Sequence, residues 1–365
     1  MRSRILFTAA ISLGATLLLP AASHALSYDA EYVFGDSLSD RGNLAETGIL
    51  QTEAGLPVTN FPDPPSNHDS FTNGPTAVQV LANDLGLNAN PSLWVTGFKD
   101  VNNLFGGASY TPGTNYAVAG AIAAPSLPQG GVPGANLPQQ VAAYLAGSGG
   151  KADPNALYTV FIGGNDVRNA ALYGNGTTGP AGITTGVMTE IGVIQALSAA
   201  GARNFLVPNV PNVGIIPEFA QDNPTLAAAA TSYSQSYDAQ LSADLGGLSL
   251  PQGTDLTQFD LYGYNAEIAA NAAALGFTNT TDRCFTNTPL SAAATPQCGP
   301  DGQNVDSFIY WDDIHPTAPV QALWADGMLE ALEGNPNPSP VPEPATFALL
   351  GAGLLGVAGL RRRRA

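Results

Sequence analysis

The sequence predicts an α/β fold in which a mostly parallel sheet lies between two layers of helices. Short apolar, β-branched runs alternate along the chain with longer stretches in which apolar residues recur every three or four positions. Glycine, proline or short polar residues separate most of these stretches, as expected where strands and helices end. Alternating strands and helices form βαβ units, which place helices on both faces of a parallel sheet.

The stretch 157–162 is a run of β-branched and aromatic residues typical of a buried strand, and the stretches 76–85 and 183–200 carry the apolar stripe of a helix. Pro75 precedes the first of these helices, and Gly201 and Gly276 follow two others. We expect strands at 28–34, 115–119, 157–162, 205–208, 258–261 and 307–310, and helices at 76–85, 137–145, 183–200, 227–245, 266–275 and 319–332.

The first strand ends in a stretch that suits a nucleophilic serine. The apolar run 32–34 ends in Gly35, and Ser37 follows two residues later. We expect a tight turn here and a helix that opens at Leu38 and Ser39. A hydroxyl at the carboxyl end of a strand and near the positive end of a helix is placed to attack a carbonyl group. The simpler interpretation is that the serine only caps the helix.

Three further polar clusters follow later strands. Gly120 comes after the second predicted strand, the sequence Gly-Gly-Asn-Asp at 163–166 follows the third, and residues 312–315 (Asp-Asp-Ile-His) follow the last. Ligands of open α/β sheets bind at the carboxyl ends of the strands. We therefore expect all three clusters to meet Ser37 at one edge of the sheet.

A nucleophilic serine needs a base, and outside the two chain ends the histidines are His68 and His315. Asp312 lies three residues before His315, a spacing that lets its carboxylate accept the ring N–H and turn the other nitrogen toward Ser37. Asp313 is the local alternative. His68 lies in a polar, proline-rich loop and is expected to be an exposed surface residue.

Acyl transfer also needs donors for the oxyanion. The N–H groups of Ser37 and Gly120 and the side-chain amide of Asn165 supply three. The structural alternatives are a turn glycine at 120 and a loop-capping amide at 165. Together the residues fit acyl transfer by a nucleophilic serine.

The four clusters resemble the blocks of the GDSL lipase/esterase family, part of the SGNH hydrolases. The matching residues are Gly-Asp-Ser-Leu at 35–38, the block glycine at 120, Gly-x-Asn-Asp at 163–166 and Asp-x-x-His at 312–315. The resemblance covers roughly 31–333, and intermediate stretches such as 71–75, 201–205 and 262–284 look like the larger members found in plants and in bacterial phospholipase and esterase relatives.

The resemblance implies a flavodoxin-like, three-layer α/β/α fold of the SGNH type. It implies hydrolysis of a carboxylic ester through an acyl-enzyme, a reaction that requires no metal and no organic cofactor. Ser37 is then the nucleophile, and Asp312 and His315 complete the triad. It also implies an oxyanion hole formed by Ser37, Gly120 and Asn165.

The two chain ends are predicted to be processing segments. Residues 1–25 have the basic start, apolar stretch and small-x-small exit of a secretory signal peptide, and the apolar stretch is short for a membrane anchor. Residues 26–334 are then the hydrolase domain. The proline-rich stretch 335–340 is a linker.

Residues 341–365 begin with Val-Pro-Glu-Pro, continue as an apolar run and end in four arginines followed by one alanine. This order resembles the PEP-CTERM sorting signal. The resemblance implies recognition by an exosortase, transient attachment to the inner membrane of a Gram-negative bacterium and release to the cell surface, the exopolysaccharide matrix or the medium. A plain C-terminal anchor is the alternative. The Gly-x-Gly-x-x-Gly at 351–356 follows no strand and is not a dinucleotide site.

The net charge and the cysteine content limit which partners the protein is expected to bind. The two chain ends hold six basic residues and one acidic residue, so the body keeps 6 basic and 28 acidic residues, a net charge of −22. Such a field repels nucleic acids. Cys284 and Cys298 lie close together in the sequence, and export favours a disulfide between them. No histidine lies nearby to complete a metal site.

Two other functions stay open from the sequence. The same triad would serve an acyltransferase, and a catalytically inactive matrix protein could carry the same sorting tail. The expected substrate is an ester or a lipid. The glycine- and proline-rich insert 90–112 is a candidate for lining its acyl pocket.

Overall fold

The structure is a computed structural model that describes residues 26–44, 70–94, 113–126, 132, 134–286, 295–296, 298 and 304–340. The expected signal peptide 1–25, His68 and the sorting tail 341–365 lie outside these residues, so the predictions for them remain predictions.

A four-stranded parallel sheet forms the centre of the molecule, in the order β1 (Glu31–Gly35), β2 (Leu157–Phe161), β3 (Asn204–Pro208) and β4 (Asp255–Phe259). Their registers pair the first residue of each strand with the first residue of the next. Because every strand runs the same way, all four carboxyl ends meet at one edge. The predicted parallel sheet is confirmed.

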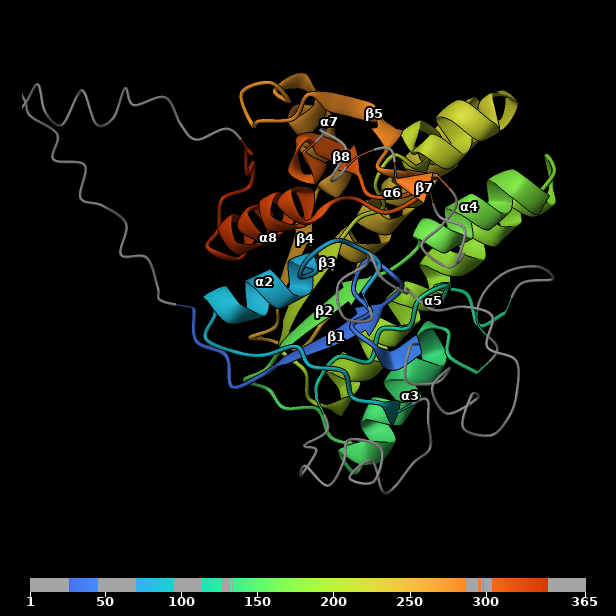
Figure 1. Ribbon diagram of the computed structural model, residues 1–365. Helices are drawn as coiled ribbons and strands as arrows, with labels where there is room; N and C mark the ends of the chain where they lie inside the picture. The colour runs from blue at the N-terminus through green and yellow to red at the C-terminus, as the bar shows by residue number, and fades with distance from the viewer. Residues whose placement is uncertain are drawn as a thin grey trace, which may run out of the picture.

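Helices cover both faces of this sheet (Figure 1). One face packs against α2 (Ala77–Asp84) and α8 (Ala318–Leu332), and the other packs against α3 (Leu137–Gly147), α5 (Thr178–Ala200) and α6 (Pro224–Gly246). The fold is therefore a three-layer α/β/α arrangement, as expected.

Side chains alternate along each strand and therefore pack against the helices on both faces of the sheet. On β2, Tyr158 points toward α3 and touches Tyr144, whereas Phe161 points the other way and meets Trp324 of α8. Successive side chains of a strand face opposite sides, so a strand buried on both faces reads as a continuous apolar run. This is why the sequence alone indicates β2.

Local signals also set the helix boundaries. The N–H of Thr76 donates to the Gln79 side chain at the start of α2, which completes a capping box. Gly201 ends α5 at φ 126°, and a Cβ there would lie 2.7 Å from the carbonyl oxygen of Ala152. Within the described part of the chain, α5 is the one helix long and apolar enough to span a membrane, and it packs inside the domain against α3, α4 (Gly164–Tyr173) and α6.

Two predicted strands differ in the structure. Residues 115–119 form no strand: Asn115 makes only isolated bridges to Val33 and Pro91. The N–H groups of Tyr116 and Val118 still donate to the carbonyls of Val33 and Gly35, so the segment lies along β1 without forming a regular strand. The Asn115 side chain donates to the carbonyl of Ser39 and accepts the N–H of Ala117, which joins the segment to the serine turn. The last strand, β8 (Phe308–Tyr310), pairs in parallel with β5 (Asn279–Arg283) in a separate sheet rather than with the central one.

Several helix boundaries also differ. The helix expected at 266–275 is α7 (Leu261–Ala270), which begins earlier because the Asp260 carboxylate caps it by accepting the N–H of Gly263. The strand before it therefore ends at 259 rather than 261. Helix α4 is not among the predicted helices, because its glycine-rich, polar start resembles a loop.

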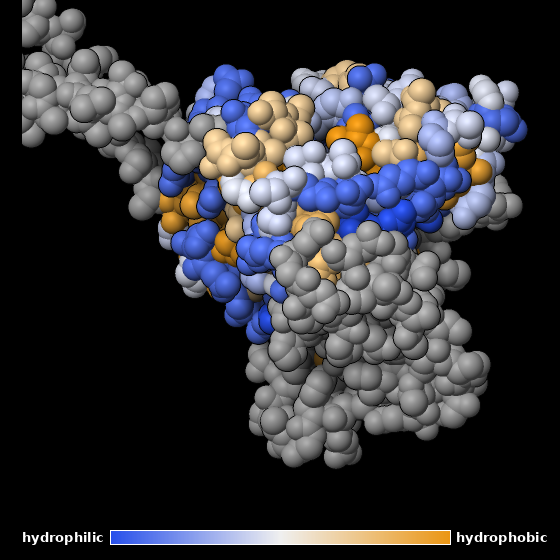
Figure 2. Space-filling view, turned by 45° about the horizontal axis from the view of Figure 1, so that its top comes forward, coloured by the Kyte–Doolittle hydropathy of each residue, from blue (hydrophilic) through white to orange (hydrophobic). Residues whose placement is uncertain are grey.

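Short elements complete the described chain. They are η2 (Val213–Ile215), the π-helical turn η3 (Glu218–Asp222), η4 (Val305–Ser307) and the hairpin strands β6 (Phe285–Thr286) and β7 (Thr295–Pro296). On the face shown in Figure 2, hydrophilic residues separate the hydrophobic ones over the described surface.

Candidate active site

The turn that carries Ser37 is built by its neighbours. A Cβ on Gly35 would lie 2.4 Å from the carbonyl oxygen of Phe161, so only glycine fits at the end of β1. The Gln140 side chain binds both the N–H and the carbonyl of Gly35, each at 2.8 Å. The Asp36 carboxylate then accepts the N–H of Leu38 at 3.0 Å. These contacts fix the serine at the carboxyl edge of the sheet.

The predicted helix start at 38–39 is wrong. These residues lie in a turn, and helical backbone begins at 43–44. The Asp40 carboxylate accepts the N–H groups of residues 42–44, so Asp40 supplies the cap. It also accepts the N–H of Ala119 at 2.8 Å. One buried carboxylate thus joins the serine turn to the segment that carries Gly120.

The structure brings Ser37, His315 and Asp312 together from opposite ends of the domain. His315 Nε2 lies 2.7 Å from Ser37 Oγ. His315 Nδ1 lies 2.8 Å from Asp312 Oδ2 and 3.0 Å from Oδ1. Asp312 is fully buried and His315 is 5 % exposed. This is the geometry that a serine nucleophile, a base and an orienting carboxylate require.

The two candidate carboxylates have different partners. Asp312 Oδ1 accepts the N–H groups of Ile314 and His315, which folds the loop back on itself. The Asp313 carboxylate instead forms an ion pair with Arg283. Of the two, Asp312 therefore faces the imidazole.

Neighbouring segments brace the histidine loop. Thr317 Oγ1 donates to the carbonyl of Phe308 at 2.7 Å, and Thr72 Oγ1 donates to the carbonyl of Pro316 at 3.0 Å. The Phe71 ring lies against the His315 ring, with centroids 5.1 Å apart. Residues far apart in the sequence thus hold the imidazole toward the serine.

The disulfide expected from the sequence is present. Cys284 and Cys298 are bonded, with Cα atoms 5.0 Å apart. The N–H of Cys284 donates to the carbonyl of Tyr310, and the Phe285 ring packs on Trp311 with centroids 4.5 Å apart. The bridge therefore supports the strand that leads into the Asp312 loop.

The three candidate oxyanion donors come from adjacent segments. Among the described residues, no acceptor binds the N–H of Ser37 or of Gly120, so both donors are free. Gly120 has φ 80°, a conformation that favours glycine. The Asn165 amide donates one hydrogen bond to the carbonyl of Ala121 at 2.9 Å, which leaves its second N–H.

Asp166 fixes the relation between these segments. It lies in the first turn of α4, and its carboxylate accepts the N–H of Ala123 at 2.7 Å and of Ala124 at 3.1 Å. Burial raises the pKa of Asp166 to about 7, and the two N–H donors oppose the rise. The sequence places this residue in a motif but indicates no role for it.

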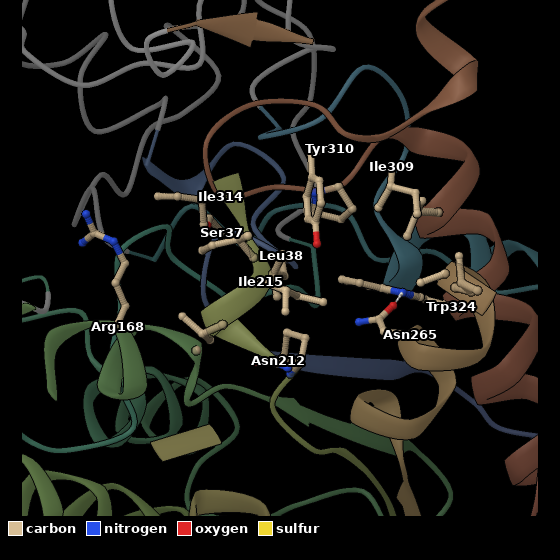
Figure 3. A pocket seen from close by; sticks show the side chains of 18 of the residues that line it. Ser37, Leu38, Arg168, Asn212, Ile215, Asn265, Ile309, Tyr310, Ile314 and Trp324 are labelled. Carbon is tan, nitrogen blue, oxygen red and sulfur yellow. Dashed lines mark hydrogen bonds between the residues drawn. The ribbon is translucent and has the colours of Figure 1, made fainter. Parts of the chain in front are cut away.

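A pocket opens beside Ser37 with an empty volume of about 870 Å³, its mouth included. Its walls are mainly apolar and come from β8, α7, α8 and η2 (Figure 3). On one side lies Arg168, which forms a two-point ion pair with Glu218. Ile215, 45 % exposed, is also among the lining residues.

Sequence reasoning missed most of this pocket. The side chains of Asn265, Tyr310 and Trp324 come from three separate elements, and nothing in their local patterns indicates that they meet. Arg168 could have been found from the sequence, because it lies one helical turn after the predicted site residue Asn165. The insert 90–112, expected to line the pocket, lies mostly outside the described residues, and its described residues 90–94 are not among the lining residues.

Two family profiles match the chain. The PEP-CTERM protein-sorting motif matches residues 340–364, which agrees with the predicted tail. This motif implies recognition by an exosortase, export from the cytoplasm and a cell-surface or extracellular location. The profile of the GDSL-like lipase/acylhydrolase family matches residues 32–328, most of the chain.

Curated relatives include Lipase 1 of Photorhabdus luminescens, which is 35% identical over 208 residues. This match covers 56% of the chain but only 26% of the relative, so the chain spans about a quarter of that protein. GDSL esterase/lipase LIP-4 of Arabidopsis thaliana is 26% identical over 366 residues, and the match covers 89% of this chain and 92% of that one.

Among solved structures, an acetylxylan esterase from Geobacillus stearothermophilus is 12% identical with a TM-score of 0.39, and the match covers 88% of this chain and 100% of that one. By the profile match over 32–328, the chain belongs to the GDSL-like lipase/acylhydrolase family, a family of carboxylic ester hydrolases.

Proposed function

We propose that the protein is an exported serine ester hydrolase in which Ser37 forms an acyl-enzyme. The observation that carries the proposal is the 2.7 Å approach of His315 Nε2 to Ser37 Oγ, with Asp312 on the other ring nitrogen. Asp312 holds the tautomer whose free nitrogen faces the hydroxyl.

In the proposed reaction His315 takes the proton of Ser37 as the oxygen bonds to the ester carbonyl carbon. The negative charge on the former carbonyl oxygen is stabilised by the N–H groups of Ser37 and Gly120 and by the Asn165 amide. When the intermediate collapses, the C–O bond to the alcohol breaks and His315 returns the proton to that alcohol. A water molecule, activated by the same imidazole, then releases the acid and restores Ser37.

The proposed route to the cell surface uses both chain ends. Residues 1–25 would direct export and be removed, and residues 341–365 would hold the protein transiently at the inner membrane of a Gram-negative cell. Exosortase cleavage near the Pro-Glu-Pro would then release the domain to the surface or the exopolysaccharide matrix. The sorting-motif match supports this order of events.

The test is hydrolysis of short and medium p-nitrophenyl esters by the purified protein. Ser37→Ala and His315→Ala should each lower kcat by roughly 10⁴-fold or more, because triad members act as a unit. Ser232→Ala, an exposed serine on α6, is the matched control and should retain full activity.

Other outcomes select the alternatives. Equal rates for the native protein and Ser37→Ala would overturn the proposed nucleophile. If no ester is hydrolysed, the inactive matrix protein is favoured. If product analysis with added alcohols shows new esters in place of the free acid, the protein is an acyltransferase.

A further inference from the structure

The pocket beside Ser37 has mainly apolar walls, and Tyr310 and Asn265 are among its polar lining residues. Ile268, Ile309, Val320 and Trp324 supply buried apolar walls. Figure 3 shows the Tyr310 hydroxyl and the Asn265 amide nitrogen pointing into the space between these walls. The pocket therefore presents two hydrogen-bonding groups among mainly apolar walls.

Protein contacts fix both groups. Asn265 Oδ1 accepts the indole N–H of Trp324 at 2.7 Å, which turns the amide nitrogen into the pocket. Tyr310 is only 8 % exposed, and burial raises the pKa of its hydroxyl, which stays protonated. Among the described residues, neither the Tyr310 hydroxyl nor Asn265 Nδ2 has a hydrogen-bond partner.

Unpaired polar groups in an apolar pocket discriminate strongly between ligands. A ligand that offers no partner leaves them desolvated at a cost, whereas a ligand oxygen at that position recovers the hydrogen bonds. A purely alkyl chain would thus fill the pocket poorly, despite its apolar walls.

The acyl part of the ester is the part that suits this pocket. The alcohol leaves before deacylation, whereas the acyl group stays bonded to Ser37 until water attacks. Ser37 and Leu38 line the pocket together with residues of α7 and α8, so the pocket is open to a group bonded to the serine. A sugar, with hydroxyls on every side, would leave most of them facing apolar side chains.

We propose that the enzyme prefers acyl groups that carry an oxygen function, a hydroxyl or carbonyl, several carbons from the ester. The Tyr310 hydroxyl and the Asn265 amide bind that oxygen, and the apolar walls bind the intervening methylenes. This inference rests on the proposed ester hydrolysis at Ser37.

The experiment compares pairs of p-nitrophenyl esters of equal length with and without a terminal hydroxyl: hexanoate, octanoate and decanoate against their ω-hydroxy forms. We expect kcat/KM to favour the hydroxyacyl ester at one of these lengths. In Tyr310→Phe that ratio should fall roughly three- to tenfold, the effect of one lost hydrogen bond. Tyr264→Phe, a buried tyrosine of α7 outside this pocket, is the matched control and should keep the ratio.

Hydrolysis of p-nitrophenyl acetate tests the proposed function separately, because a two-carbon acyl group carries no distal oxygen for Tyr310 and Asn265 to bind. If the acetate is hydrolysed but the ratio is the same in Tyr310→Phe, or plain esters are preferred at every length, the inference is wrong and the hydrolase stands. If no ester is hydrolysed, the proposed function itself fails.

Discussion

Asp166 is the residue on which the two segments of the candidate oxyanion hole depend. Its carboxylate binds the N–H groups of Ala123 and Ala124, while the adjacent Asn165 binds the carbonyl of Ala121. These three bonds span the residues directly after Gly120. Losing Asp166 would therefore free the loop on one side of the proposed oxyanion and leave two buried N–H groups unpaired.

We expect Asp166→Ala to lower kcat by about ten- to a hundredfold with a smaller change in KM, because preorganised donors act mainly in the transition state. Binding of a phosphonate that mimics the tetrahedral intermediate should weaken in proportion. Asp166→Asn keeps one acceptor, so its kcat should lie between those of the native protein and of Asp166→Ala. Asp84→Ala, exposed on α2, is the control. A raised KM with unchanged kcat would contradict the positioning role.

Glu31 gives the stability of the protein a pH dependence. It is fully buried, and Thr159 donates to its Oε1 while Oε2 has no partner among the described residues. Burial raises its pKa to about 8, against an ordinary value of 4.5. Between these pH values the unfolded chain loses the proton and the folded chain keeps it. Stability therefore falls as the pH rises from 4.5 to 8.

Glu31→Gln keeps the acceptor for Thr159 and removes the titration. We expect the native protein to lose about 2 to 4 kcal/mol more unfolding free energy than Glu31→Gln between about pH 5 and pH 8. Urea unfolding at both pH values measures the difference. The exposed Glu267→Gln should behave like the native protein. Parallel pH profiles for native and Glu31→Gln proteins would show that another group dominates.

At the scale of elements, the paired strands β5 and β8 support the loop that carries His315. Arg283, at the end of β5, binds Asp222 of η3 and Asp313, the neighbour of Asp312. Cys284 follows directly, and its disulfide joins residues 14 positions apart. A bridge over such a loop stabilises a fold by about 3 kcal/mol, mainly by restricting the unfolded chain.

Replacing Cys284 and Cys298 by alanine should accordingly lower the unfolding free energy by about 2 to 4 kcal/mol. Reduction of the native protein should give the same denaturation midpoint as the double variant. The reductant should not affect the variant, which is the control. If reduction shifts both proteins equally, the bridge is not the source of the stability.

The elements show why prediction succeeds in some places and fails in others. β2 and α5 carry strong local patterns and lie within a few residues of their predicted positions. α4 escapes prediction because its helix depends on packing against α5 and α6, not on its glycine-rich start. The approach of Ser37, Asp312 and His315, the proposed triad, was predictable from motif spacing. The pocket was not, since Asn265, Tyr310 and Trp324 meet only through the tertiary fold.

At the scale of the whole molecule, the domain and the sorting tail are expected to be separable. The hydrolase profile ends at 328 and α8 ends at Leu332. The linker begins with Asn335, whose N–H and side chain bind Glu330 at 2.9 and 2.8 Å. Linker residues 335–338 line a groove beside α6 and α7 together with Asn209 and Tyr264. Residues 335–338 therefore pack on the hydrolase domain, and the expected boundary to the sorting tail lies after them.

A chain that stops after Pro340 should therefore keep its activity, with kcat/KM within about twofold of the full chain in ester hydrolysis, because the domain's contacts with the linker are intact. A shorter chain that stops after Glu333 loses the Asn335 contacts and should unfold at a lower urea concentration. Sorting is tested separately, in cells that contain an exosortase. There the full chain should reach the cell surface, whereas the chain ending at Pro340 should not be retained there. Glu343→Ala, within the Pro-Glu-Pro, tests sorting without shortening the chain. Loss of activity in the Pro340 truncation would show instead that the tail is part of the working enzyme.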